Sequence, residues 1–340
     1  MKADTDEGRW QSVGLSGGGG TEMPAISPHD PNLMLINCDM SGAYRSTDGG
    51  RHWQMLNWRQ LTGCALCAPA FHPTDPNVVF AAYSQAATLR ISHDKGVTWQ
   101  PVGSGLPGGL RQIVVDPDAP RRMLAGTTDG VFHSLDGGET WRSSAGMSGQ
   151  VRGFHFDRTS PQARRVCITA TAQGIFRSED GGITWESIGA GLDELPIMAF
   201  AGASNAGTGE CRLYAWLDGP GEQGAKLSRG IIFRSDDRGT TWQSLGPMPV
   251  WGGEEQGNHY LLVTDMAPGR LYAVKPIFTK DDTVWRSDDA GASWRPIAFT
   301  FKSDSRYNLQ DNYVNSWFQS MQGWTTCAAA IDPKNPDRLL

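Results

Sequence analysis

Aromatic side chains gather, among polar residues, in three long segments of the sequence. They are Trp58 in residues 53–69; Trp251, His259 and Tyr260 in residues 247–260; and Tyr313, Trp317 and Trp324 in residues 299–326. Aromatic rings stack on the C–H faces of sugars, and neighbouring amide and carboxylate groups bond the sugar hydroxyls. These segments therefore predict a saccharide-binding surface. The alternative is that the same side chains pack the long segments onto the rest of the molecule.

Acidic residues on loops are candidates for acid–base chemistry. Inverting hydrolysis of a glycosidic bond needs two carboxyl groups about 6.5–9.5 Å apart, one to activate water and one to protonate the leaving oxygen. Asp39, Asp129 and Asp218 each fall between two apolar stretches that read as consecutive strands. For Asp39, the alternative is an aspartate that caps a turn. Further carboxylates in the long segments are Glu254, Glu255, Asp304 and Asp311.

Metal and cofactor chemistry has weak support in the sequence. Of six cysteines, only Cys64 and Cys67 are close together, whereas a structural zinc site usually takes four ligands from two such pairs. Buried free thiols or one local disulfide explain them better. The glycine run at residues 17–20 follows no β-α-β pattern, so it is not a phosphate-binding loop. We expect no metal and no cofactor.

The charge balance excludes two classes of partner. The chain has a formal net charge of -6 at pH 7, whereas nucleic-acid binding requires a basic face. No run of 18 apolar residues suggests a membrane span, and the first seven residues are too polar for a signal peptide. We expect neither a nucleic-acid nor a membrane partner, in a cytoplasmic protein or a secreted one without its leader.

One motif recurs along the chain. The sequence Ser-x-Asp-x-Gly-x-(Thr/Ser/His)-Trp occurs six times, at residues 46–53, 92–99, 134–141, 178–185, 235–242 and 287–294. Its tryptophans are 46, 42, 44, 57 and 52 residues apart, which is typical of four-stranded propeller blades. Serine and aspartate side chains can bond the N–H groups of a tight turn, and glycine supplies a positive φ. The motif therefore predicts a stapled turn between the third and fourth strands of each blade.

The two ends of the sequence predict how the ring closes. Residues 10–14 copy the strand that follows each motif, and residues 327–340 read as the first strand, the turn and the start of the second strand of another blade. Joining them would leave no open sheet edge. We predict an all-β, seven-bladed β-propeller, a single domain over residues 1–340, whose last blade is closed by the N-terminal strand and is truncated, without a third strand and a motif.

The motif resembles the Asp-box (BNR) repeat of sialidases, sortilin-type receptors, photosystem II assembly propellers and glycoside hydrolase family 74 xyloglucanases. The opening is similar to that of the xyloglucanases: a glycine run at residues 17–20, a Pro/Asn turn at residues 24–32, and Asp-x-x-Gly-Ala-Tyr-Arg at residues 39–45. This resemblance implies that Asp39 is a catalytic carboxylate, the general base, and that Tyr44 and Arg45 lie in the substrate site. It also implies a β-glucan substrate such as xyloglucan and an extracellular or periplasmic location.

The resemblance has a gap. Xyloglucanases take their second carboxylate from a second propeller, which this sequence lacks, so Asp129 or Asp218 would have to replace it. We therefore expect the chain alone to hydrolyse xyloglucan poorly, and a second propeller to be a partner. The arginine element near the start of sialidases is absent. The remaining alternative is a non-catalytic propeller of the sortilin or photosystem-assembly type that binds a protein or peptide.

Overall fold

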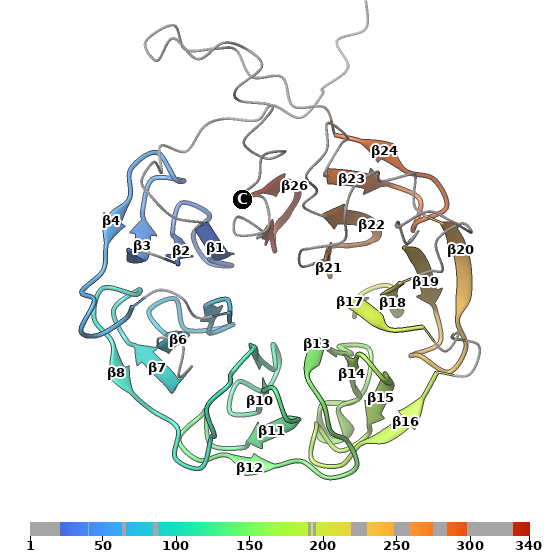
Figure 1. The fold of residues 1–340 in the computed structure, drawn as a ribbon, viewed down its shortest axis with the longest axis horizontal. Coiled ribbons are helices and arrows are strands. Elements are labelled where there is room, and N and C mark those ends of the chain that lie inside the picture. The colour runs from blue at the N-terminus through green and yellow to red at the C-terminus, as the bar shows by residue number, and fades with distance from the viewer. Residues whose placement is uncertain are drawn as a thin grey trace, which may run out of the picture.

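The chain folds into a ring of small antiparallel sheets around a central axis (Figure 1). The computed structural model describes residues 21–39, 41–62, 66–83, 88–189, 192, 195–218, 230–247, 259–274, 284–297 and 329–340. In this part of the chain, six four-stranded sheets form blades 1 to 6, and one two-stranded sheet, the C-terminal sheet, follows them.

The strands follow one another in chain order. Blade 1 has β1 (Thr21–Ile26), β2 (Met34–Cys38), β3 (Gly42–Ser46) and β4 (Gln54–Met55), and blade 2 has β5 (Ala70–Phe71), β6 (Val79–Tyr83), β7 (Thr88–Ser92) and β8 (Gln100–Pro101). Blade 3 has β9 (Gln112–Val115), β10 (Met123–Gly126), β11 (Val131–Ser134) and β12 (Arg142–Ser143), and blade 4 has β13 (Val151–Phe156), β14 (Cys167–Thr171), β15 (Gly174–Ser178) and β16 (Glu186–Ile188).

Blade 5 has β17 (Ile197–Asn205), β18 (Glu210–Leu217), β19 (Ile231–Ser235) and β20 (Gln243–Pro247), and blade 6 has β21 (Tyr260–Thr264), β22 (Ala267–Val274), β23 (Val284–Ser287) and β24 (Arg295–Pro296). The C-terminal sheet has β25 (Ile331–Asp332) and β26 (Asn335–Leu339), and a short 3-10 helix, η1 (Gln162–Arg164), lies between β13 and β14. The described part of the chain has no helix that is both long and apolar enough to cross a membrane.

Each blade runs from the axis outwards. Its first strand is innermost, as β1, β13, β17 and β21 show, and its fourth strand runs along the rim (Figure 1). The hydrophobic core lies between neighbouring blades, where, for example, Ile168 of blade 4 packs in one cluster with Leu213 of blade 5. Both side chains are fully buried, which contributes about 1.5–3 kcal/mol for each.

The six motif turns have the hydrogen bonds that the sequence predicts. In blade 4, Ser178 Oγ donates to Asp180 Oδ1 over 2.7 Å and accepts the N–H of Gly182 over 2.8 Å, and Gly182 has a φ of 98°. The indole of Trp185 is buried beneath the turn and donates to the carbonyl oxygen of Gly182 over 3.1 Å. The serine, aspartate and glycine bonds recur in all six motifs. The predicted turn staple is confirmed.

Strand alternation gives the ring two different faces. The turns between first and second strands lie beside the motif turns, because Gly181 donates its N–H to Arg165 and Gly137 donates to Arg121. We call this the motif face. The loops between second and third strands lie at the opposite ends of the strands, on what we call the loop face. The connections into each innermost strand meet these loops there, since Gly149 donates to the carbonyl oxygen of Asp129.

The fold class is confirmed as an all-β propeller, but the predicted count of seven blades needs correction. The described residues form six blades, each with four strands, and the C-terminal sheet has only two strands. The physical reason is that, among the described residues, this sheet is made of β25 and β26 alone, without a third strand or a motif turn. The strand predicted to close this blade, residues 10–14, lies outside the described residues, so closure by it stays a prediction.

Candidate functional site

The three predicted aspartates lie on the loop face, but on different blades. Asp39 follows β2 in blade 1, Asp129 lies between β10 and β11 in blade 3, and Asp218 follows β18 in blade 5. Asp129 is exposed, whereas Asp39 and Asp218 are half-buried. The three carboxylates therefore belong to alternate blades of the ring.

The structure brings Asp39 together with a residue that sequence reasoning missed. Glu22, on β1, is paired with Asn37 of β2, and Thr21 with Cys38, so Glu22 and Asp39 are at the same end of two neighbouring strands. Burial, and then the negative charge of Asp39, raise the pKa of Glu22. Blade 1 therefore holds a pair of carboxyl groups of which one retains its proton more readily than an ordinary glutamate.

The backbone beside Glu22 is unusual. The β1–β2 pairing is irregular between Glu22 and Ala25, and Met23 has a φ of 51°. A positive φ is uncommon for a residue other than glycine, and such conformations and bulges cluster at functional sites. No motif marks Glu22 in the sequence. The available signal was a charged residue at the start of a strand that otherwise reads as buried.

Glu22 belongs to a set of equivalent positions. In blades 1 to 4, one residue at the start of the turn after the innermost strand donates its N–H back across that turn; these residues are Ser27, His72, Asp116 and Asp157. Counting back five residues from each gives Glu22, Cys67, Arg111 and Arg152, which we call the inner ring. All four lie at the loop-face end of the innermost strands or just before it. The inner ring thus combines a carboxyl group, a thiol and two guanidinium groups.

The inner-ring thiol is a poor nucleophile. Cys67 is fully buried, and burial raises its pKa to about 12. A thiolate is the reactive form, so Cys67 is inert at neutral pH. The other described cysteines, Cys38, Cys167 and Cys211, are likewise buried free thiols.

The predicted binding residues of blade 1 are dispersed. Tyr44 donates its hydroxyl hydrogen to Ser41 Oγ over 2.9 Å, beside the loop that carries Asp39. Arg45 instead donates from Nε to the carbonyl oxygen of Lys95, in the motif turn of blade 2, over 2.7 Å. Arg234 makes an equivalent contact, because its Nη1 donates to the carbonyl oxygen of Ala290 in the next blade over 3.2 Å. Arg45 is therefore held at the motif face as a contact between blades, and a role in binding for it stays a prediction.

The predicted aromatic residues that the structure describes lie in different settings. Trp58 is 59% exposed, with the guanidinium of Arg59 over its ring, and lies near the rim, because Gln60 accepts the N–H of Trp99. His259 packs edge-on against the buried Trp216, with ring centroids 4.7 Å apart. The packing alternative therefore fits His259. Tyr260, the first residue of β21, is half-buried at the loop-face end of an innermost strand.

Several predicted residues lie outside the described part of the chain. They are the aromatic residues Trp251, Tyr313, Trp317 and Trp324, the carboxylates Glu254, Glu255, Asp304 and Asp311, and Cys64. Their predicted roles remain predictions.

One trio in the described part of the chain could hold a metal ion. The ligand atoms of His155, Asp157 and Cys211 lie within 4.8 Å of one another, and all three residues are buried. The carboxylate of Asp157, however, already accepts Arg238 Nε over 2.6 Å and the N–H of Thr159 over 2.8 Å. These bonds satisfy the carboxylate within the protein, and the guanidinium group would repel a cation.

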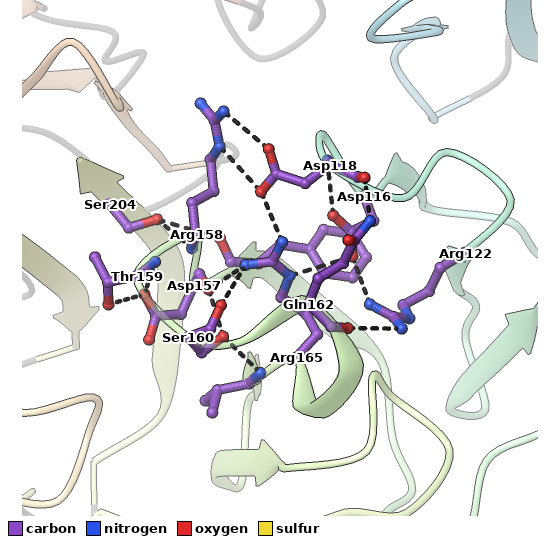
Figure 2. A network of polar contacts seen from close by, with 12 residues as sticks. Asp116, Asp118, Arg122, Asp157, Arg158, Thr159, Ser160, Gln162, Arg165 and Ser204 are labelled. Atoms are coloured by element: carbon purple, nitrogen blue, oxygen red, sulfur yellow. Dashed lines mark hydrogen bonds and ion pairs between the residues drawn. The ribbon is translucent and has the colours of Figure 1, made fainter. Parts of the chain in front are cut away.

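A network of ion pairs lies on the motif face (Figure 2). Arg165 is 2% exposed and donates to Asp116 and Asp118 of blade 3, and Asp118 also accepts Arg158. Arg158 reaches Asp265 of blade 6 over 3.7 Å. These charges are paired with one another, so the network links blades 3, 4 and 6 as a structural contact.

The fold and this face define the chain as a β-propeller with a mixed acidic and basic ring at the loop-face end of its innermost strands. No protein-family model matches the chain. The chain is 30% identical to a xyloglucanase of Paenibacillus sp over 157 residues, which are 39% of this chain and 15% of the relative. It is 27% identical to a xyloglucanase of Hypocrea jecorina over an alignment of 407 residues that covers 97% of this chain and 47% of the relative. The chain thus spans about half the length of the second relative, and less of the first.

A solved structure also matches nearly the whole chain with about half of its own length. The GH74 xyloglucanase from Xanthomonas campestris superposes with a TM-score of 0.65 at 22% identity, over 98% of this chain and 52% of that one. At 22% identity, this likeness shows the propeller fold alone.

Proposed function

We propose that this chain is a carbohydrate-active propeller that acts on a β-glucan such as xyloglucan at its loop face, as an inverting endo-glycoside hydrolase with Asp39 as general base. The observation that carries this proposal is the pair of carboxyl groups formed by Glu22 and Asp39 in blade 1. General acid–base catalysis at a glycosidic bond needs one carboxylate to accept a proton from water and one carboxylic acid to supply a proton.

The two members of the pair suit different roles. Asp39 lies on a half-buried loop, where an ionised carboxylate can accept a proton from water. Glu22 is partly withdrawn from water and faces a like charge, so its proton is held to a higher pH. Glu22 is thus a proton donor within the same blade. Asp129 and Asp218 remain candidates for the second carboxylate, each on a different blade of the loop face.

Similarity to other proteins supports the substrate class. The relatives that align with the chain are named xyloglucanases, and one of them aligns along nearly the whole chain. We accordingly propose that the chain is one propeller domain over residues 1–340, closed by residues 10–14, that its Ser-x-Asp motifs are Asp boxes, and that it acts outside the cytoplasm with a second propeller as partner.

Asp39→Asn tests the proposal. The amide is nearly isosteric but cannot accept the proton, so release of reducing ends from xyloglucan should fall by about 10²–10⁴-fold, while calorimetry shows unchanged binding of the polysaccharide. Asp129→Asn and Asp218→Asn test the other two candidate carboxylates on the same face. If one of these abolishes hydrolysis and Asp39→Asn does not, the assignment of Asp39 is wrong.

The wild-type chain supplies the second readout. Binding of xyloglucan without hydrolysis would place the acid outside this chain, in accord with the expected second propeller. If the chain binds no polysaccharide and Asp39→Asn changes nothing, the carbohydrate function fails, and the protein-binding alternative replaces it.

A further inference from the structure

Two arginines occupy the inner ring side by side. Arg111 immediately precedes β9 of blade 3, and Arg152 is the second residue of β13 of blade 4. The two blades are neighbours, and both residues are five positions before a turn aspartate, Asp116 or Asp157. The positive charge of Arg111, after burial, lowers the pKa of Arg152, which agrees with two guanidinium groups held near each other.

Arg152 lies at an irregularity of the sheet ladder. Val151 pairs with Thr171 and Gly153 pairs with Ala170, so Arg152 is the extra residue of a β-bulge. Bulges are common beside binding sites, where they redirect a side chain. Arg111 is anchored by its own N–H, which donates to the carbonyl oxygen of Gly126 over 2.7 Å.

The two guanidinium groups have no anionic partner in the described part of the chain. Most of its arginines form ion pairs, as Arg122 does with Asp116 and Arg238 with Asp157. Within the same residues, neither Arg111 nor Arg152 has an ion pair or a side-chain hydrogen bond, and the buried Nε atoms of both lack an acceptor. Burying unpaired donors of like charge costs free energy, unless a ligand completes them.

We propose that Arg111 and Arg152 form a subsite for the carboxylate of an acidic sugar, so that the ligand of the loop face is a glucan that carries uronate residues. Guanidinium groups bind carboxylates through paired, charge-assisted hydrogen bonds. The inference rests on the proposed saccharide binding at this face. A saccharide is favoured over a peptide because the arginines share the inner ring with Glu22. Glu22 lies next to the candidate general base Asp39, where a sugar ring would be positioned for hydrolysis.

A matched pair of ligands tests the subsite. Isothermal titration calorimetry would compare cellotetraose with cellotetraose oxidised at C6 to glucuronate, and a xyloglucan oligosaccharide would test the proposed function separately. The oxidised ligand should bind the wild-type chain about tenfold or more tightly than cellotetraose. Its affinity should fall as salt is raised, while that of the neutral ligand stays constant.

Variants locate the effect. Arg111→Gln and Arg152→Gln should each remove most of the preference for the oxidised ligand and leave xyloglucan binding unchanged. Arg164→Gln is the control. It removes the same charge, but the side chain of Arg164 is 77% exposed and lies on the motif face. Thermal unfolding of each variant would show whether it is folded. If a variant does not fold, the salt dependence of the wild-type affinity for the oxidised ligand still tests the subsite.

Each outcome decides between the proposals. Equal binding of the two cellotetraoses, independent of salt, overturns the uronate subsite while xyloglucan binding upholds the proposed function. If none of the saccharides binds, both the uronate subsite and the proposed function are overturned. Binding of an acidic peptide that depends on Arg111 and Arg152, without binding of the oxidised ligand, would assign the arginines to a protein partner and overturn the saccharide. A preference for the oxidised ligand that is retained in both variants would also overturn the assignment.

Discussion

The phenol of Tyr272 in blade 6 donates a hydrogen bond to the carbonyl oxygen of Pro336 in the C-terminal sheet over 2.7 Å. Tyr214 of blade 5 makes the same contact with Pro268 of blade 6, also over 2.7 Å. The C-terminal sheet therefore packs on blade 6 as blade 6 packs on blade 5. On its other side, Arg338 lies against Gly49 in the motif turn of blade 1.

Tyr272→Phe measures how far the C-terminal sheet stabilises the ring. Loss of the phenolic hydrogen bond should lower the free energy of unfolding by about 1 kcal/mol in urea titrations. Tyr214→Phe is the matched variant between two complete blades. If Tyr214→Phe is destabilising and Tyr272→Phe is silent, the C-terminal sheet does not belong to the cooperative unit.

Asp180→Ala removes a turn staple on the motif face. Asp180 accepts the N–H groups of Ile183 and Thr184, both over 3.0 Å, and the variant should lose about 1–2 kcal/mol of stability. Polysaccharide binding, measured by calorimetry, should not change, because the loop face is at the other ends of the strands. Impaired binding with intact stability would mean that the two faces are assigned the wrong way round.

The network in Figure 2 predicts acid sensitivity. Partial burial opposes ionisation of Asp118, but hydrogen bonds and charge from Arg158 and Arg165 outweigh it and lower its pKa. A depressed folded-state pKa stabilises the fold above the unfolded value of about 3.9, and this contribution is lost as the pH falls through the folded value.

Asp118→Asn should therefore cost about 1–2 kcal/mol at pH 7, with a cost that shrinks towards pH 3 in denaturant titrations. Glu179→Gln is the control, because the carboxylate of Glu179 is 51% exposed and its ion pairs contribute little. A pH-independent cost for Asp118→Asn would show that packing, and not charge, is lost.

Glu22 predicts the opposite pH dependence. Because the pKa of Glu22 is raised in the folded state, the folded protein loses stability as the pH rises from the unfolded value through the folded one. Glu22→Gln should be more stable than the wild type at pH 7, by less than about 1 kcal/mol because water screens a half-exposed group, and equally stable below about pH 4. The exposed Glu139→Gln should show no such gain. A Glu22 variant that is less stable at pH 7 would argue for a structural carboxylate.

The sequence alone determined that the chain is an all-β propeller, but not its number of blades, because the evidence for the blade is local and repeated. Each motif specifies a turn through side chains at most four residues apart, such as Ser178, Asp180 and Gly182, and six copies at blade-length spacing predict a propeller. Asp39, Asp129 and Asp218 were also placed correctly on loops between second and third strands, since strand alternation follows from the repeat.

Tertiary structure decided which of these groups meet. Glu22 and Asp39 are 17 positions apart and become neighbours only through the pairing of β1 with β2. Arg111 and Arg152 come together because successive blades place equivalent residues around one axis, and the bulge at Arg152 depends on the register with β14. The contact of Arg45 with the motif turn of blade 2 likewise depends on how neighbouring blades pack, and its predicted binding role remains a prediction. Proximity across strands and blades depends on register and ring closure, which no local pattern of residues encodes.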